Sequence, residues 1–276
     1  MRSSEVTVVL SGGGAKTAAH LGAYRAVREG GLTARRFVAT SMGAVIAAGL
    51  AGGAAEKELL ERLTEVGSRG IVRDPLAAVS GLFARSLLRP APLRRAIELL
   101  VPARSFADLA VPLTVSVVDL DSGELLLFGS GGEDGPLIDV LCASCALPLY
   151  FPPVTLDGRR CGDGGLRGVL PLEAAGRLAA EPVVAVDVGP GFDTAPAPAP
   201  GPPVLRAHDE AVGTLMAAHT AAQLAHWRSD AAMPPLLYVR PAVERNATFR
   251  VERMRQYSED GHEAARDALA RWRASP

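Results

Sequence analysis

The sequence predicts an α/β fold with a central, mostly parallel sheet flanked by helices. Short apolar, β-branched runs at residues 6–10, 37–39 and 182–188 are typical of buried strands. A turn of small residues and then a helical pattern follow each of the first two runs. This alternation of strand, turn and helix is how a parallel sheet wrapped by helices begins.

The N-terminal elements each carry a local signal. The first strand ends in a glycine turn at residues 11–14, and residues 18–29 then show helical spacing. Gly30-Gly31 would end that helix as a C-cap. The small apolar residues 44–50, after the second strand, predict a buried helix.

The middle of the chain changes character. Residues 55–104 have mixed apolar and arginine content with four prolines as breaks, which predicts a helical insertion. A hairpin turn with strands on both sides follows, and then a helix and a second hairpin. These predicted elements are strands 113–118 and 125–128, helix 137–146 and hairpin 151–158.

The last third begins with a loop at residues 189–204, rich in proline, glycine and alanine. A long helix at 205–228, a strand at 236–240 and a last helix that starts at His262 are expected to follow. Because these elements are too few for an independent core, residues 1–276 are predicted to form a single domain.

Composition excludes several classes of protein. A formal net charge of −1 leaves no broad basic field for nucleic acid. The three cysteines are an odd number, which favours a reducing compartment over a disulfide framework. Cys142 and Cys145 would share one helix face, and no second ligand pair with zinc spacing follows them. No metal site is therefore expected.

The sequence shows no signal peptide and no run of 18 apolar residues. A cytoplasmic protein is expected, and any contact with a membrane would be peripheral.

Ser41 stands where a nucleophile elbow would place its serine, between an apolar strand and a helix of small residues. Such a sharp turn needs small residues two positions before and after the serine, here Ala39 and Gly43. The start of a helix also offers backbone N–H groups to a developing oxyanion. The alternative is that Ser41 is only a helix N-cap.

Three glycines, Gly12, Gly13 and Gly14, allow backbone N–H groups to converge on one point, as in oxyanion and phosphate sites. Lys16-Thr17 imitates the end of a phosphate-binding loop, but Leu10 and Ala15 stand where that motif requires glycine. A simple flexible turn is the remaining alternative.

Asp163 lies between glycines, which would let its carboxylate approach another loop closely. The alternative is an ordinary Asp-Gly turn. For a Ser-His-Asp triad in the hydrolase chain order, His262 is the histidine in a suitable position.

Together these motifs resemble the patatin-like phospholipase family. The matching stretches follow in the family's order and cover about the first 170 residues. They are Ser11-Gly12-Gly13-Gly14-Ala15-Lys16, Ala19-His20-Leu21-Gly22, Thr40-Ser41-Met42-Gly43, Ala143-Ser144-Cys145-Ala146-Leu147-Pro148, Phe151-Pro152-Pro153-Val154 and Gly162-Asp163-Gly164-Gly165. Two positions depart from the family pattern: Ala39 replaces the first elbow glycine, and Thr17 replaces a glycine after the basic residue.

The resemblance implies a three-layer fold and a Ser-Asp dyad with no metal or organic cofactor. Ser41 would attack a lipid acyl ester, of a phospholipid or lysophospholipid, and Asp163 would accept its proton. Backbone N–H groups of Gly12 to Gly14 would hold the oxyanion. The alternative function is a catalytically silent lipid- or acyl-binding module of the same fold.

Overall fold

The computed structural model describes residues 4–68, 86, 88–193, 203–245 and 247–274. Its strands form one sheet with the order β5-β6-β3-β2-β1-β7-β8, and β4 pairs with β3. The strands are β1 Glu5–Leu10, β2 Thr33–Thr40, β3 Leu113–Asp119, β4 Leu125–Gly129, β5 Val154–Leu156, β6 Arg159–Asp163, β7 Val183–Val186 and β8 Leu236–Val239.

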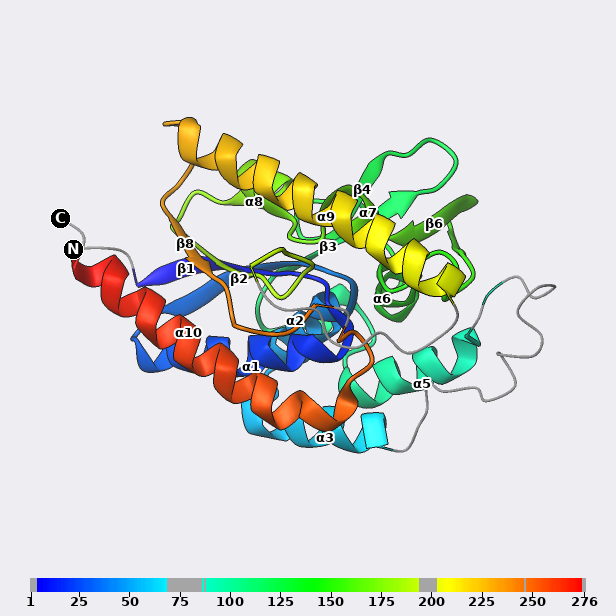
Figure 1. Cartoon of the computed structure of the whole chain (residues 1–276), viewed down its shortest axis with the longest axis horizontal. Coiled ribbons are helices and arrows are strands. Elements are labelled where there is room, and N and C mark those ends of the chain that lie inside the picture. The colour runs from blue at the N-terminus through cyan, green and yellow to red at the C-terminus, as the bar shows by residue number, and fades with distance from the viewer. Residues whose placement is uncertain (1–3, 69–85, 87, 194–202, 246, 275–276) are drawn as a thin grey trace.

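Helices cover both faces of the sheet, which gives three layers (Figure 1). On one face α10 lies along α1, with α2 and α3 beside them, and on the other face α9 runs across α7 and α8. The α-helices are α1 Ala18–Glu29, α2 Ser41–Ala51, α3 Glu56–Ser68, α5 Pro90–Leu100, α6 Leu137–Ser144, α7 Gly165–Gly168, α8 Leu172–Leu178, α9 Pro203–Ser229 and α10 Met254–Ala274. Short 3-10 helices are η1 Gly14–Thr17, η2 Phe106–Asp108 and η3 Val251–Arg253.

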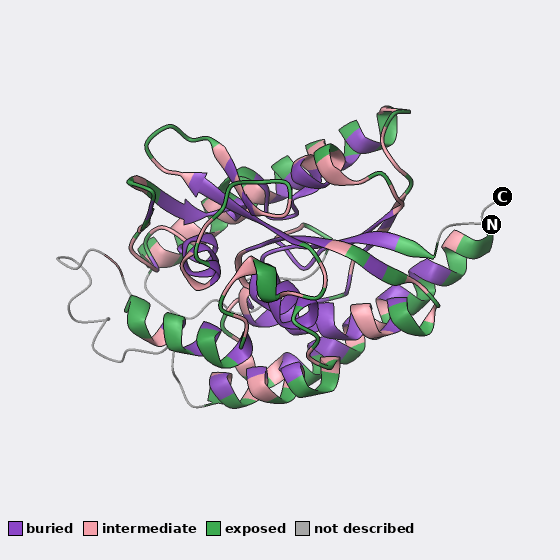
Figure 2. Ribbon diagram, turned by 180° about the vertical axis from the view of Figure 1, so that it is seen from behind, coloured by how far each residue is buried: buried purple, intermediate pink, exposed green. Residues whose placement is uncertain are grey.

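Alternate strand residues fill two separate cores, because successive side chains of a strand point to opposite faces. Val8 and Leu10 belong to the core under α1, α2 and α10. Val9, between them, belongs to the core under α8 and α9, which includes Leu224 and Trp227. Figure 2 shows the central strands and α2 as almost entirely buried. Parallel strands covered on both faces are expected to be mostly apolar, and β1 is apolar except for the exposed Glu5 and the buried Thr7.

The strand β3 brings together two segments that are distant in sequence. Ser116 of β3 pairs with Thr40, the last residue of the parallel strand β2. The next residue, Val117, pairs with Asp163, the last residue of the antiparallel strand β6. Since β4 pairs with β3 along both stretches, β2 and β6 must share the other edge. Their carboxyl ends therefore meet, with Ser41 and Asp163 at the junction.

The predicted α/β class is confirmed, and the strand and helix order agrees with the sequence patterns. Within the predicted insertion, residues 55–104, the structure has α3 and α5, while residues 69–85 and 87 lie outside the described residues. Most of the proline-rich loop, residues 194–202, also lies outside them. Within the parts of the chain that the structure describes, every helix is too short or too polar to cross a bilayer.

The prediction that the last helix starts at His262 is wrong, since α10 begins at Met254. Gly261, inside this helix, allows two helices to touch. A Cβ at Gly261 would lie 2.0 Å from the carbonyl oxygen of Ala19, and one at Gly22 would lie 1.7 Å from that of Ser258. The α1 and α10 backbones therefore pack in direct contact, which no residue larger than glycine permits.

Replacing Gly261 by alanine is expected to lower the free energy of unfolding by roughly 1–3 kcal/mol, because the new methyl forces α10 away from α1. Urea denaturation measures this. The control is Gly213→Ala on α9, where the nearest atom would be 3.7 Å away. That change should leave stability unaltered or raise it by up to about 1 kcal/mol through helix propensity. Equal stabilities for Gly261→Ala and wild type would contradict the close crossing.

Candidate active site

Ser41 occupies a strained turn between β2 and α2. Its φ is 53°, in the left-handed region that residues with a side chain rarely adopt. The helix packs tightly against the glycine turn at this point, because a Cβ at Gly43 would lie 2.2 Å from the carbonyl oxygen of Ser11. Ala39, at the other predicted support position, is fully buried. The turn from β2 into α2 is therefore sharp and closely packed, with small residues two positions on either side of Ser41.

Asp163 reaches Ser41 at the end of β6. The Ser41 hydroxyl donates a hydrogen bond of 2.7 Å to Asp163 Oδ2. Gly164 makes the approach possible, since a Cβ there would lie 2.4 Å from both the Ser116 carbonyl oxygen and Thr40 Oγ1. The second carboxylate oxygen, Oδ1, accepts a 2.7 Å bond from the N–H of Gly165.

Asp163 is buried, with 4% of its surface exposed. Burial raises its pKa from an ordinary value of 3.8 to about 6, while the hydrogen bonds from Ser41 and Gly165 lower it. At neutral pH the group is therefore mostly ionised, with a basicity greater than that of a solvated aspartate. An aspartate of this kind can accept a proton from a serine hydroxyl.

The glycine turn lies beside the same serine. A Cβ at Gly12 would lie 3.0 Å from Cβ of Ser41, so the two main chains are in contact. The N–H of Gly12 donates 2.8 Å to the carbonyl of Val169, just after α7. Gly13 and Gly14 are partly exposed, and within the described ranges their N–H groups donate to no protein acceptor. Gly14 has a φ of 59°, which suits glycine.

Two basic side chains that follow this turn, Lys16 and His20, are buried. Burial lowers the pKa of His20 to about 4, so its ring is neutral and Nε2–H donates 2.8 Å to the Ser11 carbonyl. Burial and the charge of Arg240 lower the pKa of Lys16 to about 8. Lys16 is 3% exposed, so it is not displayed toward solvent as a phosphate-binding lysine would be.

No histidine contacts Ser41 or Asp163 among the described residues. His262, the triad alternative, is hydrogen-bonded at 2.7 Å to Glu29, between α10 and α1. In the same ranges, no group of three or more His, Cys, Asp or Glu side chains could hold a metal ion. The structure thus brings together Ser41, Asp163 and the glycine turn, and within the described ranges no histidine side chain is hydrogen-bonded to either residue.

One contributor was missed by sequence reasoning, the segment at the end of α6. Ser144 Oγ accepts a 2.8 Å bond from the N–H of Ser41, and the Ala146 carbonyl accepts a 3.1 Å bond from the N–H of Asp163. In the sequence, the six-residue stretch around them, residues 143–148, is distinctive only as part of the family resemblance. Its contacts depend on tertiary packing, so no local pattern assigns them a role.

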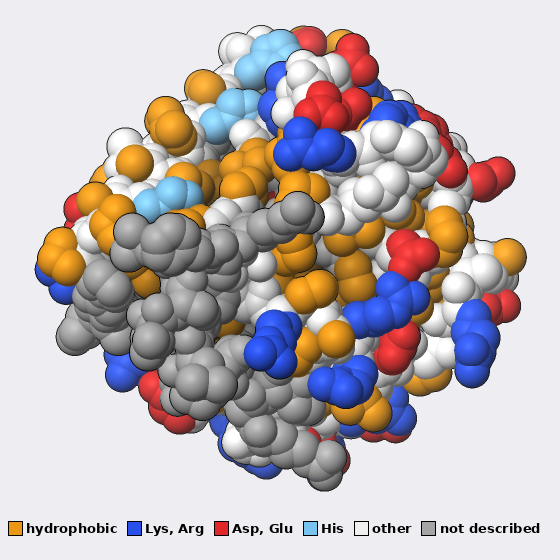
Figure 3. Space-filling view, turned by 90° about the vertical axis from the view of Figure 1, so that its right-hand side faces the viewer, with side chains coloured by type: hydrophobic (Ala, Val, Ile, Leu, Met, Phe, Trp, Pro, Cys, Tyr) orange, Lys and Arg blue, Asp and Glu red, His pale blue; other side chains and the backbone are white. Residues whose placement is uncertain are grey.

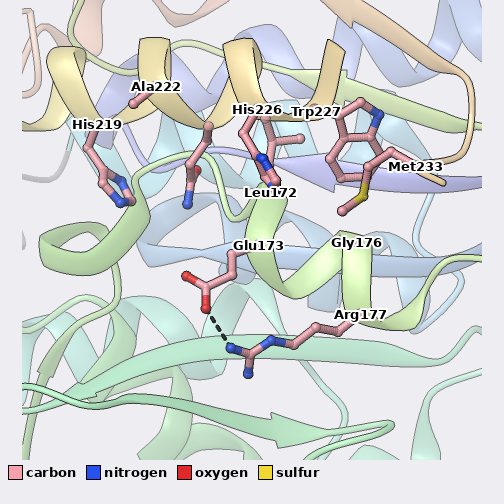
Figure 4. A pocket seen from close by; sticks show the side chains of 10 residues that line it. Leu172, Glu173, Gly176, Arg177, His219, Ala222, His226, Trp227 and Met233 are labelled. Carbon is pink, nitrogen blue, oxygen red and sulfur yellow. Dashed lines mark hydrogen bonds and ion pairs between the residues drawn. The ribbon is translucent and has the colours of Figure 1, made fainter. Parts of the chain in front are cut away.

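A separate cavity of about 510 Å³ lies between α8 and α9 (Figure 4). Trp227, Met233, His219 and His226 are among the residues that line it, and neither Ser41 nor Asp163 does. It is therefore distinct from the site at the elbow.

Comparison with known proteins gives a family match and several similar proteins. The model of the family "Patatin-like phospholipase" matches residues 8–175. An uncharacterized NTE family protein of Mycobacterium tuberculosis is 30% identical over 201 residues, covering 70% of this chain and 53% of the relative. Patatin-like phospholipase domain-containing protein 6 of Homo sapiens is 27% identical over 197 residues, covering 70% of this chain and 14% of that protein. The chain thus spans about half the length of its mycobacterial relatives.

Among solved structures, VipD from Legionella pneumophila resembles the chain with a TM-score of 0.54 and 15% identity, covering 98% of this chain and 67% of that one. At that identity the likeness shows a shared fold. The family match extends over more than half of the chain and includes both Ser41 and Asp163. The chain therefore belongs to the patatin-like phospholipase family.

Proposed function

We propose that this chain is a serine acyl-hydrolase that cleaves lipid acyl esters, with Ser41 as nucleophile and Asp163 as its base. The observation that carries the proposal is the 2.7 Å hydrogen bond from the Ser41 hydroxyl to the buried Asp163 carboxylate. Membership of the patatin-like phospholipase family supports a lipid substrate. A single domain over residues 1–276 remains part of the proposal.

In the proposed reaction, Asp163 accepts the hydroxyl proton while Ser41 Oγ attacks the ester carbonyl carbon. The tetrahedral intermediate collapses, and Asp163 returns the proton to the departing alcohol. The acyl group is then bonded to Ser41. Water attacks this acyl-enzyme, again with Asp163 as base, which releases the fatty acid and restores the hydroxyl. No atom of a cofactor enters these steps.

The oxyanion would be held by backbone N–H groups at the glycine turn. Since the N–H of Gly12 already donates to Val169, we assign this role to Gly13 and Gly14, whose N–H groups have no acceptor in the described residues. Gly12 instead serves close packing against Ser41. The first turn of α2 adds the positive end of a helix dipole at the same place.

Exposed apolar side chains near the elbow support a lipid substrate. Leu166, on α7, is exposed three residues after Asp163. Leu149 is exposed just after residues 144–146, which contact both Ser41 and Asp163. Phe249 is next to Thr248, which touches Gly14. The end of the molecule where α6 and the start of α9 lie carries hydrophobic side chains interspersed with Lys and Arg and with some Asp and Glu (Figure 3). Peripheral contact with a lipid surface is consistent with such a face.

Ser41→Ala and Asp163→Asn should each lower kcat for a p-nitrophenyl acyl ester by roughly a thousandfold or more, because each removes a reacting group. A fluorophosphonate should label the wild type at Ser41, as mapped by mass spectrometry of peptides, and should leave Ser41→Ala unlabelled.

The matched controls are Ser122→Ala and Asp157→Asn, which change the same residue types in exposed turns. Both should hydrolyse and label as the wild type does. Lipid binding to a wild type that neither hydrolyses esters nor reacts with the phosphonate would instead support the silent binding module.

The acid limb of kcat/KM should follow the ionisation of Asp163. Its raised pKa of about 6 predicts that kcat/KM falls about tenfold per pH unit below that value, since only the carboxylate accepts the proton. The pH dependence of phosphonate labelling should show the same midpoint. A plateau that extends down to pH 4 would contradict Asp163 as the base.

The same raised pKa affects stability. Between about pH 4 and 6 the folded chain retains a proton on Asp163 that the unfolded chain has released. Raising the pH through this window therefore lowers the free energy of unfolding, by about 3 kcal/mol for a shift of two pKa units. The free energy of unfolding of Asp163→Asn does not have this pH-dependent decrease, because its amide does not titrate. In urea denaturation, the stability of this variant relative to wild type should therefore increase from pH 4 to pH 7. A difference that stays constant with pH would refute the raised pKa.

A further inference from the structure

The three residues at the end of α6 contact both members of the dyad. Ser144 is fully buried, and its hydroxyl accepts the N–H of Ser41 at 2.8 Å while donating to the Ser116 carbonyl at 2.8 Å. Because the hydroxyl is engaged both as donor and as acceptor, its orientation is fixed. The hydroxyl thus links the nucleophile's backbone to β3.

The neighbouring residues of the segment contact the base. The Ala146 carbonyl accepts the N–H of Asp163 at 3.1 Å. Between Ser144 and Ala146 along the chain lies Cys145, whose side chain is buried. Burial, and then the charge of Asp163, raise the pKa of Cys145 well above its ordinary value, so the thiol stays neutral and does not compete as a nucleophile.

The backbone of Ser41 needs such external restraint. A non-glycine residue with positive φ costs on the order of 1–3 kcal/mol and persists only where its surroundings hold it. The first N–H groups of a helix have no partner inside the helix. At α2 the Ser41 N–H is satisfied by Ser144 from a different helix, so the strained turn is fixed from outside its own segment.

We propose that Ser144–Ala146 is a positioning clamp for the dyad, in which Ser144 holds the Ser41 backbone and Ala146 holds the end of β6. Ser144 is a positioning residue, since it acts on the reaction through Ser41. This inference rests on the proposed hydrolase function. It adds a third chain segment to the site beyond the nucleophile elbow and the Gly-Asp-Gly turn.

The test is Ser144→Ala, compared with wild type in kcat, KM and the rate of phosphonate labelling. Without its acceptor, the Ser41 N–H is freed and the hydroxyl moves off the attack position. The expected result is a fall in kcat of roughly 10- to 100-fold with little change in KM, because small misplacement of a reacting group costs about that much. Labelling should slow in parallel.

A second readout separates positioning from simple loss of stability. The Ser41 hydroxyl, the Gly165 N–H and the Cys145 thiol are the polar groups that face Asp163 among the described residues. The Ser41 bond lowers the pKa of Asp163, so displacing Ser41 should move the acid limb of kcat/KM upward from about pH 6. A merely structural role would leave this limb in place.

Two control variants complete the experiment. Ser144→Thr keeps the hydroxyl and should recover most of the lost kcat. Ser258→Ala removes another buried serine hydroxyl, on α10 away from the elbow, and should leave kcat unchanged even where it lowers stability.

If Ser144→Ala keeps wild-type kcat and acid limb, or loses only thermal stability as Ser258→Ala does, the clamp is overturned while hydrolysis stands. If the wild type itself neither hydrolyses esters nor labels at Ser41, the proposed function fails, and the catalytic role of the clamp fails with it.

Discussion

The hydrogen bond between Ser41 and Asp163 depends on two strands that end against each other on one edge of β3. β2 runs parallel to β3 and β6 runs antiparallel to it, so the carboxyl ends of β2 and β6 meet. Ser41 directly follows β2, and Asp163 is the last residue of β6. A shift of one residue in the register of either strand would turn its side chains to the opposite face of the sheet. The pairing of the strands, more than the conformation of the two loops, therefore brings Ser41 and Asp163 together.

Close main-chain contact is the second constraint, and it explains the glycines better than loop flexibility does. Gly43 and Gly164 lie where a Cβ would overlap a carbonyl oxygen, and Gly12 lies against Ser41 itself. None of these three has a positive φ, so each is required by space. The dyad sits where four chain segments converge with almost no side-chain volume between them: the glycine turn, the elbow, the end of α6 and the end of β6.

Much of this could be predicted from local patterns. The apolar runs and small-residue turns of the first 50 residues define strands and helices by period alone, and Ser41 and Asp163 stood out by their small neighbours. Their meeting could not be read locally, because it depends on the register of β3. The sequence also could not show that the Val169 carbonyl accepts the N–H of Gly12, or that Gly261 packs against Ala19. In both cases the two partners lie far apart along the chain.

The contact between α1 and α10 joins the two ends of the chain into one packed unit. The stretch shared with the family ends at residue 175, yet α1, which continues directly from the glycine turn through η1, is covered by α10. β7, also beyond that point, occupies the second edge of β1. The last hundred residues thus form part of the wall behind the glycine turn, with Val188 beside Gly13 and Thr248 beside Gly14. The stretch that the family model matches is therefore covered in part by the chain's own C-terminal third.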